Sequence, residues 1–403
     1  MNKKIKIAAI FNQEKSTGGG FNECINNAKR LQKIKNPNVE IVFIVENGSD
    51  LEPLNNLKIT VNSFNFGFFQ KIKTKIYRII INTFPVMLKA KFYSPFELFL
   101  DKNDIDLVYF LSPNSWSQDL KNKNYILTVW DVCHRDELEF PEVRNNGIFE
   151  QREYLSYKTF VKASGVIVDT EYTKQDLIMQ YGVKEKRISI IPFKPSPFLE
   201  KFESISFEDI LNKYGIENDG YIFYPAQFWP HKNHIFILDA LRLSKGSKLK
   251  YKVVFCGGNK GNLNYLKEYA DFYKLSEDII FLDFVPDYEI AAFYNHALAL
   301  VMPSYFGPSN LPPLEAFKFK TPVIYPRMNS FESFLDGACL SIDLENPQTL
   351  CDQIELLLHT PLVKHELIKK GTEKLSKINK FDDVSVINEL FNKFLVKRKC
   401  WNK

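Results

Sequence analysis

The alternation of short β-branched runs with helical patterns constrains this chain more than any other feature. In the first half, this alternation predicts buried strands at Ile5–Phe11, Val39–Val45, Leu107–Leu111, Tyr125–Val129 and Gly165–Val168, and a helix at Phe21–Lys33. Strands that alternate with helices form a parallel sheet with helices on both faces. We therefore expect a doubly wound α/β domain in this half.

The same alternation restarts after a segment punctuated by Pro192, Pro195 and Pro197, which indicates a linker. Strands are then predicted at Tyr221–Tyr224, Tyr251–Phe255, Ile279–Leu282, Leu298–Met302 and Pro322–Tyr325, and helices at His234–Leu243, Asn262–Tyr273, Tyr288–His296 and Pro347–His359. A length of 403 residues suits two domains of about 150–200 residues each. We predict an N-terminal domain over 1–195, a C-terminal domain over 196–381, and a final helical segment, 382–403, that packs back on the N-terminal domain.

Composition and charge argue against several classes of protein. The formal net charge of +5 is too small for a nucleic-acid-binding signature, so we expect no nucleic-acid partner. The six cysteines have neither CxxC spacing nor histidines at zinc spacing, which argues against a disulfide framework or metal site.

No apolar run approaches the roughly 18–20 residues of a membrane span. The apolar run near the start is short and broken by lysines, unlike a signal peptide. We expect a cytoplasmic protein.

Two segments of the first half carry candidate binding chemistry. Gly19 and Gly20 follow the first strand and open a helix, where glycines let the backbone approach a phosphate. A structural tight turn explains these glycines equally well. Asp131, His134 and Arg135 follow another strand, and ligands of open α/β sheets bind outside the carboxyl ends of strands. A purely structural histidine is the alternative there.

Two segments of the second half carry stronger signals. Lys232 lies near a helix start, where its ammonium can add to the helix dipole in binding a diphosphate. The backbone N–H groups of Ser309, Asn310 and Leu311 precede a proline-containing first helical turn and form a nest for a pyrophosphate. Glu315 follows one turn later, in an otherwise apolar run, and is placed to accept hydrogen bonds from ribose hydroxyls.

These segments and the two-domain pattern resemble family 4 glycosyltransferases, which are retaining enzymes of the GT-B fold. The resemblance spans nearly the whole chain and is strongest over 221–326. It implies two Rossmann-like domains whose parallel sheets face each other across a cleft. It also implies four donor-binding segments. Two of them are Ala226–Asn233, in which Gln227 and Lys232 contact the donor, and the glycine pair Gly257 and Gly258. The other two are Asp283–Val285, whose Val285 lines the base pocket, and the donor loop Pro303–Ala316.

The chain departs from the family pattern at three positions. The first glutamate of the family's donor loop falls on Gly307, its arginine before the lysine on Gln227, and its histidine before the aspartate on Trp130. The sequence looks like a branch of the family with Phe-Gly-Pro-Ser/Thr-Asn-Leu-Pro-Pro-Leu-Glu and Gln-Phe-Trp-Pro-His-Lys-Asn segments. We interpret the three departures as a pattern of that branch.

The resemblance implies transfer of a sugar, typically a hexose, from a nucleotide-diphosphate sugar to a glycan or lipid-linked acceptor in polysaccharide or lipopolysaccharide synthesis. No metal is expected. Lys232 and the loop amides would stabilise the leaving diphosphate, with Arg135 or His134 as helpers and Asp131 orienting the sugar or acceptor. Two alternatives stay open on the same fold: a nucleotide-sugar 2-epimerase and a non-catalytic donor-binding scaffold.

Residues 64–100 break the alternation. This stretch interleaves aromatic and aliphatic residues with six cations, which are Lys71, Lys73, Lys75, Arg78, Lys89 and Lys91. One interpretation is peripheral contact with the anionic inner membrane surface. The other is a core helix with a solvated basic face.

Overall fold

The computed structural model describes residues 4–65, 67–83, 92–200, 207–216, 220–247, 249–307, 311–327, 335 and 337–401. The chain divides into two compact units. Unit 1 comprises Met1–Val132, Glu150–Pro192 and Asp382–Lys403, and unit 2 comprises Cys133–Phe149 and Phe193–Phe381. Unit 2 thus includes two segments, 133–149 and 193–195, that the sequence analysis placed in the first domain.

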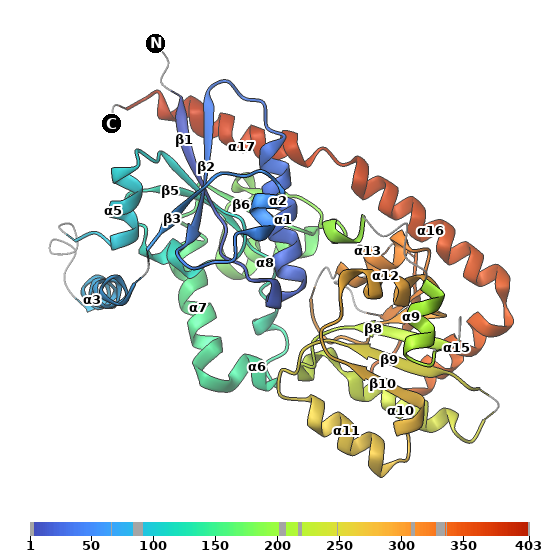
Figure 1. Cartoon of the computed structure of the whole chain (residues 1–403). Helices are drawn as coiled ribbons and strands as arrows, with labels where there is room; N and C mark the ends of the chain where they lie inside the picture. The colour runs from blue at the N-terminus through green and yellow to red at the C-terminus, as the bar shows by residue number, and fades with distance from the viewer. Residues whose placement is uncertain are drawn as a thin grey trace. The chain divides into compact units, whose positions relative to one another are not determined.

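Unit 1 is built on a seven-stranded sheet in which every paired strand is parallel (Figure 1). Its order is β3 (Val61–Phe64), β2 (Val39–Glu46), β1 (Ile5–Ile10), β4 (Leu107–Phe110), β5 (Asn124–Thr128), β6 (Gly165–Val168) and β7 (Ile188–Ile190). Strands β4 and β6 are buried along their whole length, as continuous apolar runs predict for a sheet covered on both faces.

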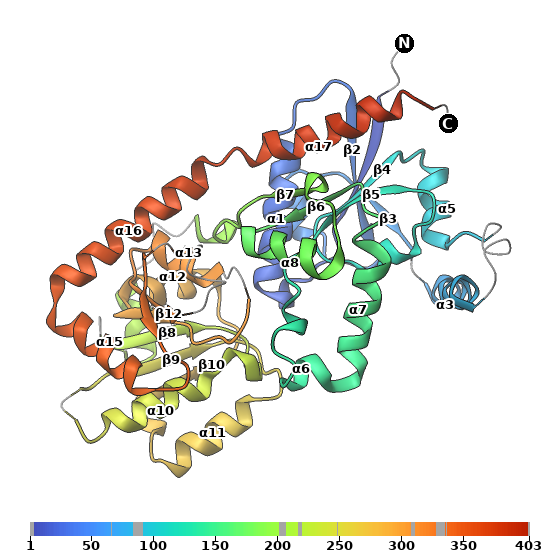
Figure 2. The same ribbon diagram turned by 180° about the vertical axis from the view of Figure 1, so that it is seen from behind.

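The helices of unit 1 include one from the end of the chain. They are α1 (Gly19–Gln32), α2 (Glu52–Asn56), α3 (Phe68–Thr83), α5 (Pro95–Lys102), α7 (Ile148–Thr159), whose first residues lie in unit 2, α8 (Glu171–Tyr181) and α17 (Asp383–Arg398). Helix α17 packs beside α1 (Figures 1 and 2). Buried Arg30 of α1 joins them, because its Nε donates to Asp383 at 2.8 Å and its Nη1 donates to Glu23.

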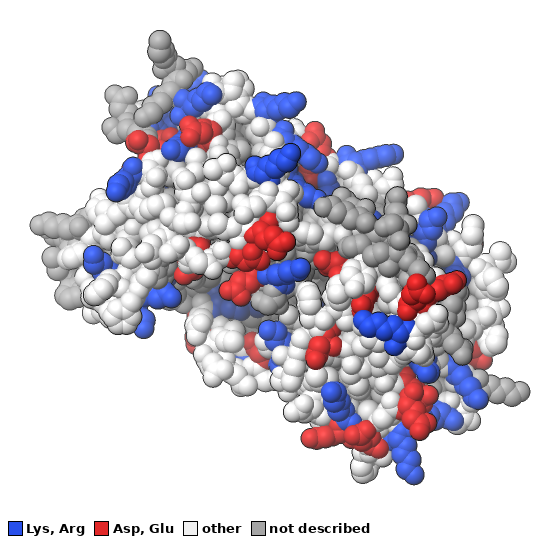
Figure 3. All heavy atoms as spheres, in the orientation of Figure 1, with Lys and Arg blue, Asp and Glu red and all other residues white. Residues whose placement is uncertain are grey.

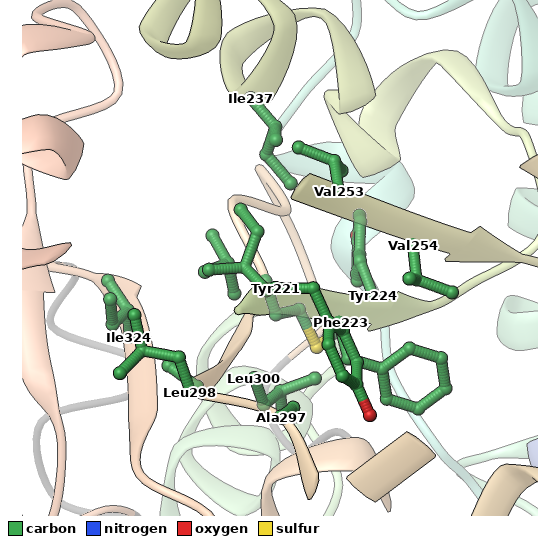
Figure 4. Close-up of a cluster of buried hydrophobic side chains, with 14 of the residues drawn as sticks. Tyr221, Phe223, Tyr224, Ile237, Val253, Val254, Ala297, Leu298, Leu300 and Ile324 are labelled. Carbon is green, nitrogen blue, oxygen red and sulfur yellow. The ribbon is translucent and has the colours of Figure 1, made fainter. Parts of the chain in front are cut away.

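Unit 2 repeats the design with six parallel strands. Their order is β10 (Ile279–Leu282), β9 (Lys252–Cys256), β8 (Tyr221–Pro225), β11 (Ala299–Val301), β12 (Val323–Pro326) and β13 (Leu340–Ile342). Figure 4 shows the core of this unit, where Phe223, Val254 and Leu300 lie among other fully buried side chains.

Helices cover both faces of this second sheet. One face carries α9 (Phe207–Lys213), α12 (Asp287–His296) and α13 (Leu311–Lys318), and the other carries α10 (His234–Ser244), α11 (Leu263–Phe272) and α15 (Gln348–His359) (Figure 1). The short helix α6 (Pro141–Arg144) and the long helix α16 (Pro361–Lys380) complete the unit. Gly371 of α16 packs so tightly on Phe317 that a Cβ would lie 2.4 Å from its ring.

The predicted elements agree with the structure at the strands of both sheet centres. Two strands, β6 and β10, have the predicted bounds, and the other predicted strands differ by one residue at one or both ends. The prediction omitted the strands β3, β7 and β13, which lie at sheet edges, and the helices α5, α7, α8, α9 and α16. The omitted strands are three or four residues long, too short to show a clear alternation.

Candidate functional site

The predicted donor-binding segments of unit 2 all follow the carboxyl ends of four neighbouring strands, β10, β9, β8 and β11. The strand order reverses between β8 and β11, so a crevice forms where the two following loops diverge. Lys232 lies on the loop after β8, and Glu315 lies on the helix that follows the loop after β11. The topology therefore places both residues at the switch point of the sheet.

Lys232 is positioned by contacts at both ends of the residue. Its ammonium Nζ donates to Ser304 Oγ at 3.4 Å, and its carbonyl accepts from the Tyr224 hydroxyl at 2.9 Å. Ser304 is fully buried after β11, and its hydroxyl donates to the carbonyl of Phe306 at 3.0 Å. The ammonium is thus held at the boundary between β8 and β11, beside the loop that leads to α13.

His231, the neighbour of Lys232, is held by residues of two other segments. Its imidazole stacks on Phe306 with ring centroids 3.9 Å apart. Glu142 of α6 accepts from its backbone N–H at 2.9 Å and lies 2.5 Å from Nδ1. Partial burial would raise the pKa of Glu142, but the hydrogen bonds from His231 outweigh it and lower that pKa. A charged Glu142 therefore fixes the turn that carries Lys232.

In the glycine pair, Gly257 is required by close packing, whereas Gly258 has free space around its Cα. A Cβ on Gly257 would lie 2.3 Å from the carbonyl oxygen of Ala226, so only glycine lets the loops after β9 and β8 meet. A Cβ on Gly258 would have no neighbour within 4 Å, and its carbonyl accepts from Phe228 N–H at 3.0 Å. Gln227 accepts from the indole N–H of Trp229 at 3.1 Å.

Glu315 is buried inside α13, with 8% of its surface exposed. The Tyr294 hydroxyl donates to Oε2 at 2.9 Å, and the Ser196 backbone N–H donates to Oε1 at 3.3 Å. Burial raises the pKa of Glu315 despite these two hydrogen bonds. A charged carboxylate here costs folding free energy, so its contribution to stability is smaller at neutral pH than in acid.

The donor loop before α13 adopts a backbone conformation that favours glycine. Gly307 has a φ of 112°, a region in which side chains with a Cβ are strained. This conformation disfavours the glutamate that the resemblance to family 4 predicts at this position. Leu311 is the buried first residue of α13, and Val285 is buried after β10. Ser309 and Asn310 lie outside the described residues.

In unit 1, the glycine segment forms the start of α1 as predicted. Helix α1 begins at Gly19, after Gly18 with a φ of 64°. A Cβ on Gly20 would lie 2.5 Å from Cη2 of Trp130, so the indole packs directly on the first helical turn. Trp130 stands where the resemblance to family 4 predicts histidine, and Gly20 makes room for its indole. The steric interpretation therefore explains Gly20, whereas Gly19 is exposed at the helix start.

The three remaining candidates fall in different units. Asp131 lies in unit 1, half-buried, and accepts from Arg152 Nη2 at 2.6 Å. His134 and Arg135 belong to the segment assigned to unit 2. His134 is buried, with its ring 5.7 Å from that of Phe149 in an edge-on contact, and Arg135 is half-buried.

The sequence analysis missed a polar cluster at the switch point of unit 1. Ser112 follows β4, and its hydroxyl donates to Asn12 Oδ1 at 3.0 Å and accepts from Gln13 Nε2 at 3.2 Å. Asn12 and Gln13 follow β1, the neighbour of β4 in the sheet. Polar residues directly after two adjacent strands are the signal that would have found this cluster.

Over the described ranges, no group of three or more histidine, cysteine, aspartate or glutamate residues has a geometry that could hold a metal ion. Among the helices of the same ranges, none is long and apolar enough to span a bilayer.

Known proteins share the architecture and part of the sequence. Residues 206–374, which lie within unit 2, match the family model described as Glycosyl transferases group 1. The crystal structure of Anabaena HepE in complex with UDP and glucose aligns with a TM-score of 0.66 and 16% identity, over 98% of this chain and 100% of that chain. The fold is GT-B. The predicted fold class, two Rossmann-like domains with parallel sheets, is thereby confirmed.

Two curated relatives have names from O-antigen synthesis. The O-antigen chain mannosyltransferase RfbU of Salmonella typhimurium is 27% identical over 243 residues, covering 59% of this chain and 62% of that protein. The O-antigen biosynthesis glycosyltransferase WclY of Escherichia coli is 31% identical over 157 residues, covering 38% of this chain and 42% of that protein. The chain therefore spans less than two thirds of the length of these relatives.

The contact between Gly20 and Trp130 yields a prediction about stability. Gly20→Ala should lower the free energy of unfolding by about 1–3 kcal/mol, because the added methyl overpacks the indole. Trp130→Ala in the same chain should relieve most of that loss. Urea unfolding of the two single variants and the double variant measures the coupling. Gly246→Ala is the matched control, since a Cβ there meets no atom within 4 Å. Additive effects of the two substitutions would contradict the prediction.

Proposed function

We propose that this protein is a retaining glycosyltransferase of family 4. It transfers a hexose from a nucleotide-diphosphate sugar to a glycan or lipid-linked acceptor. The observation that carries the proposal is the position of Lys232. Its ammonium lies at the β8–β11 switch point, 3.4 Å from Ser304 Oγ, at the start of the loop that leads into α13. A cation at this point suits a leaving diphosphate.

The proposed mechanism is electrostatic. Departure of the diphosphate develops negative charge, and Lys232 together with the backbone N–H groups at the start of α13 stabilises that charge. Gly258, Gln227 and Val285, on loops that share this edge of the sheet, line the nucleotide, and Glu315 accepts from the ribose. Asp131, His134 and Arg135 orient the sugar or the acceptor. The reaction needs no metal.

The relatives support the biological setting of the proposal. Both are named for O-antigen synthesis, one as a mannosyltransferase, and HepE was solved with UDP and glucose. We therefore infer a cytoplasmic role in lipopolysaccharide or related polysaccharide synthesis, with a nucleoside diphosphate sugar as donor and a saccharide acceptor.

The experiment that tests the function is a ligand screen without metal. In the presence of EDTA, one of UDP, GDP, dTDP, ADP and CMP should raise the melting temperature, because a ligand of the native state stabilises it by mass action. The sugar donor of that nucleotide should then transfer to an acceptor glycan. Release of an epimerised free sugar without acceptor would favour the 2-epimerase. Binding without either reaction would favour a scaffold, and a shift that requires Mg²⁺ would contradict metal independence.

Lys232→Ala should lower kcat by about 10²–10³-fold, the usual cost of removing one preorganised charge-stabilising group. Steady-state kinetics with the donor from the ligand screen measures this loss. Lys260→Ala is the matched control, because Lys260 also lies near this edge of the sheet, with its Nζ 5.8 Å from the Trp229 ring. A turnover of Lys232→Ala close to that of Lys260→Ala would remove Lys232 from the mechanism.

Glu315→Gln should weaken nucleotide binding by about 10–100-fold, since hydrogen bonds to a charged group contribute about 1.5–3 kcal/mol. Its melting temperature at neutral pH should not fall, because the amide avoids burying a charge. Tyr294→Phe is the control, as it removes the internal partner of Glu315 and leaves the carboxylate. Calorimetry distinguishes the two roles. Equal nucleotide affinity in wild type and Glu315→Gln would show that Glu315 serves the fold alone.

A further inference from the structure

Helix α3 turns its apolar side outward. Phe68 is 73% exposed and Phe69 is 77% exposed, and Ile72, Ile76 and Ile79 are exposed as well. Thr74 and Tyr77, on another side of the helix, are buried. In Figure 1 the helix lies at the edge of unit 1, away from the strands of its sheet. The interpretation of this stretch as a core helix with a solvated basic face is therefore wrong for α3.

Specific contacts outside the apolar stripe fix this orientation of the helix. Arg78 makes two parallel hydrogen bonds to Asp119, Nε to Oδ1 at 2.7 Å and Nη2 to Oδ2 at 2.8 Å. The Asp119 side chain is fully buried, so this pair anchors α3 to the body of unit 1. Asn82, in the last turn, accepts from the Tyr154 hydroxyl of α7 at 2.8 Å. The outward direction of the apolar side follows from these bonds.

The exposed side has the residue pattern of an amphipathic helix that lies in a membrane–water interface. At 100° per residue, Phe68, Ile72, Ile76 and Ile79 form one continuous stripe, and Phe69 widens it. Lys71 and Lys75 flank one edge of the stripe, and Lys73 flanks the other. All three lysines are exposed. We call this side, with its five apolar residues and three lysines, the α3 face.

The sequence segment that carries the α3 face has no acidic residue, and the groove beside it is largely apolar. No aspartate or glutamate occurs in the sequence between residues 64 and 96. Figure 3 shows Lys and Arg side chains beside uncharged surface at this end of the molecule. A groove of about 340 Å³ between α3 and α5 adds the apolar side chains of Ile80, Phe92, Tyr93 and Leu98. The apolar area thus continues beyond the helix itself.

We propose that the α3 face binds the surface of an anionic lipid bilayer. Phe68, Phe69 and the isoleucine stripe enter the boundary between headgroups and acyl chains, and Lys71, Lys73 and Lys75 contact lipid phosphates on either side. Charge selects this occupant, because two copies of this chain that paired through the same face would bring their lysines together. The inference is independent of the proposed function.

The test is binding to vesicles without donor or acceptor. The full chain should float with vesicles of equal parts phosphatidylcholine and phosphatidylglycerol, and should stay unbound with pure phosphatidylcholine. The double variant Phe68→Asn/Phe69→Asn should reduce binding at least about tenfold, because it removes two interfacial aromatic anchors. The triple variant Lys71→Gln/Lys73→Gln/Lys75→Gln should abolish the preference for phosphatidylglycerol and the sensitivity of binding to salt.

Matched controls distinguish vesicle binding through the α3 face from nonspecific binding through other exposed phenylalanines or lysines. Phe272→Asn removes a phenylalanine that is 78% exposed on α11 in unit 2, and Lys369→Gln/Lys370→Gln/Lys377→Gln removes three exposed lysines of α16. Both controls should bind vesicles like wild type. The proposal fails if wild type does not bind the anionic vesicles, or if Phe272→Asn weakens binding as much as the α3 variant. A concentration-dependent dimer that Phe68→Asn/Phe69→Asn dissociates, without vesicle binding, would overturn it in favour of a second copy.

Discussion

The candidate site of unit 2 depends on the parallel pairing of β8, β9, β10 and β11. Because all four strands run the same way, their carboxyl ends share one edge of the sheet, and the loops that follow are forced into contact. The close approach of Gly257 to Ala226 is a direct result, and so is the hydrogen bond from Lys232 to Ser304. Lys232 and Ser304 are more than 70 positions apart and still come into contact. No pattern in the sequence indicates that these two residues meet.

Polar groups at this edge are paired with one another. Glu142 is charged and fixes His231, whereas burial raises the pKa of Glu315, whose oxygens accept from Tyr294 and Ser196. His234, packed between aromatic rings, has its pKa lowered by burial to about 3 and is neutral. Lys232, the cation of this candidate site, thus lies on a turn whose neighbouring residues are already fixed by hydrogen bonds. Such preorganisation avoids a cost in reorganisation when charge develops.

Local patterns in the sequence were sufficient for the central strands and for the loops after them. Ile279–Leu282 is a continuous apolar run bounded by polar residues, and the structure gives it those bounds. The same reasoning could not find Glu142 as a partner of His231, because 89 residues separate them and nothing local in either segment indicates the other. It also left Gly20 ambiguous, since a glycine that makes room for Trp130 and a glycine that admits a phosphate look identical in a sequence.

Helix α3 shows the same limit at a surface. Hydrophobic periodicity determines that Phe68, Ile72 and Ile76 share one side of the helix, but it does not say whether that side faces the core or the solvent. The direction is decided by the ion pair of Arg78 with the buried Asp119, 41 residues away. Because a buried carboxylate without its guanidinium partner would be costly, this pair holds α3 in the orientation that exposes its apolar stripe. Because the Arg78–Asp119 pair keeps the stripe exposed, the apolar residues of the stripe and the lysines beside it indicate what kind of surface binds there.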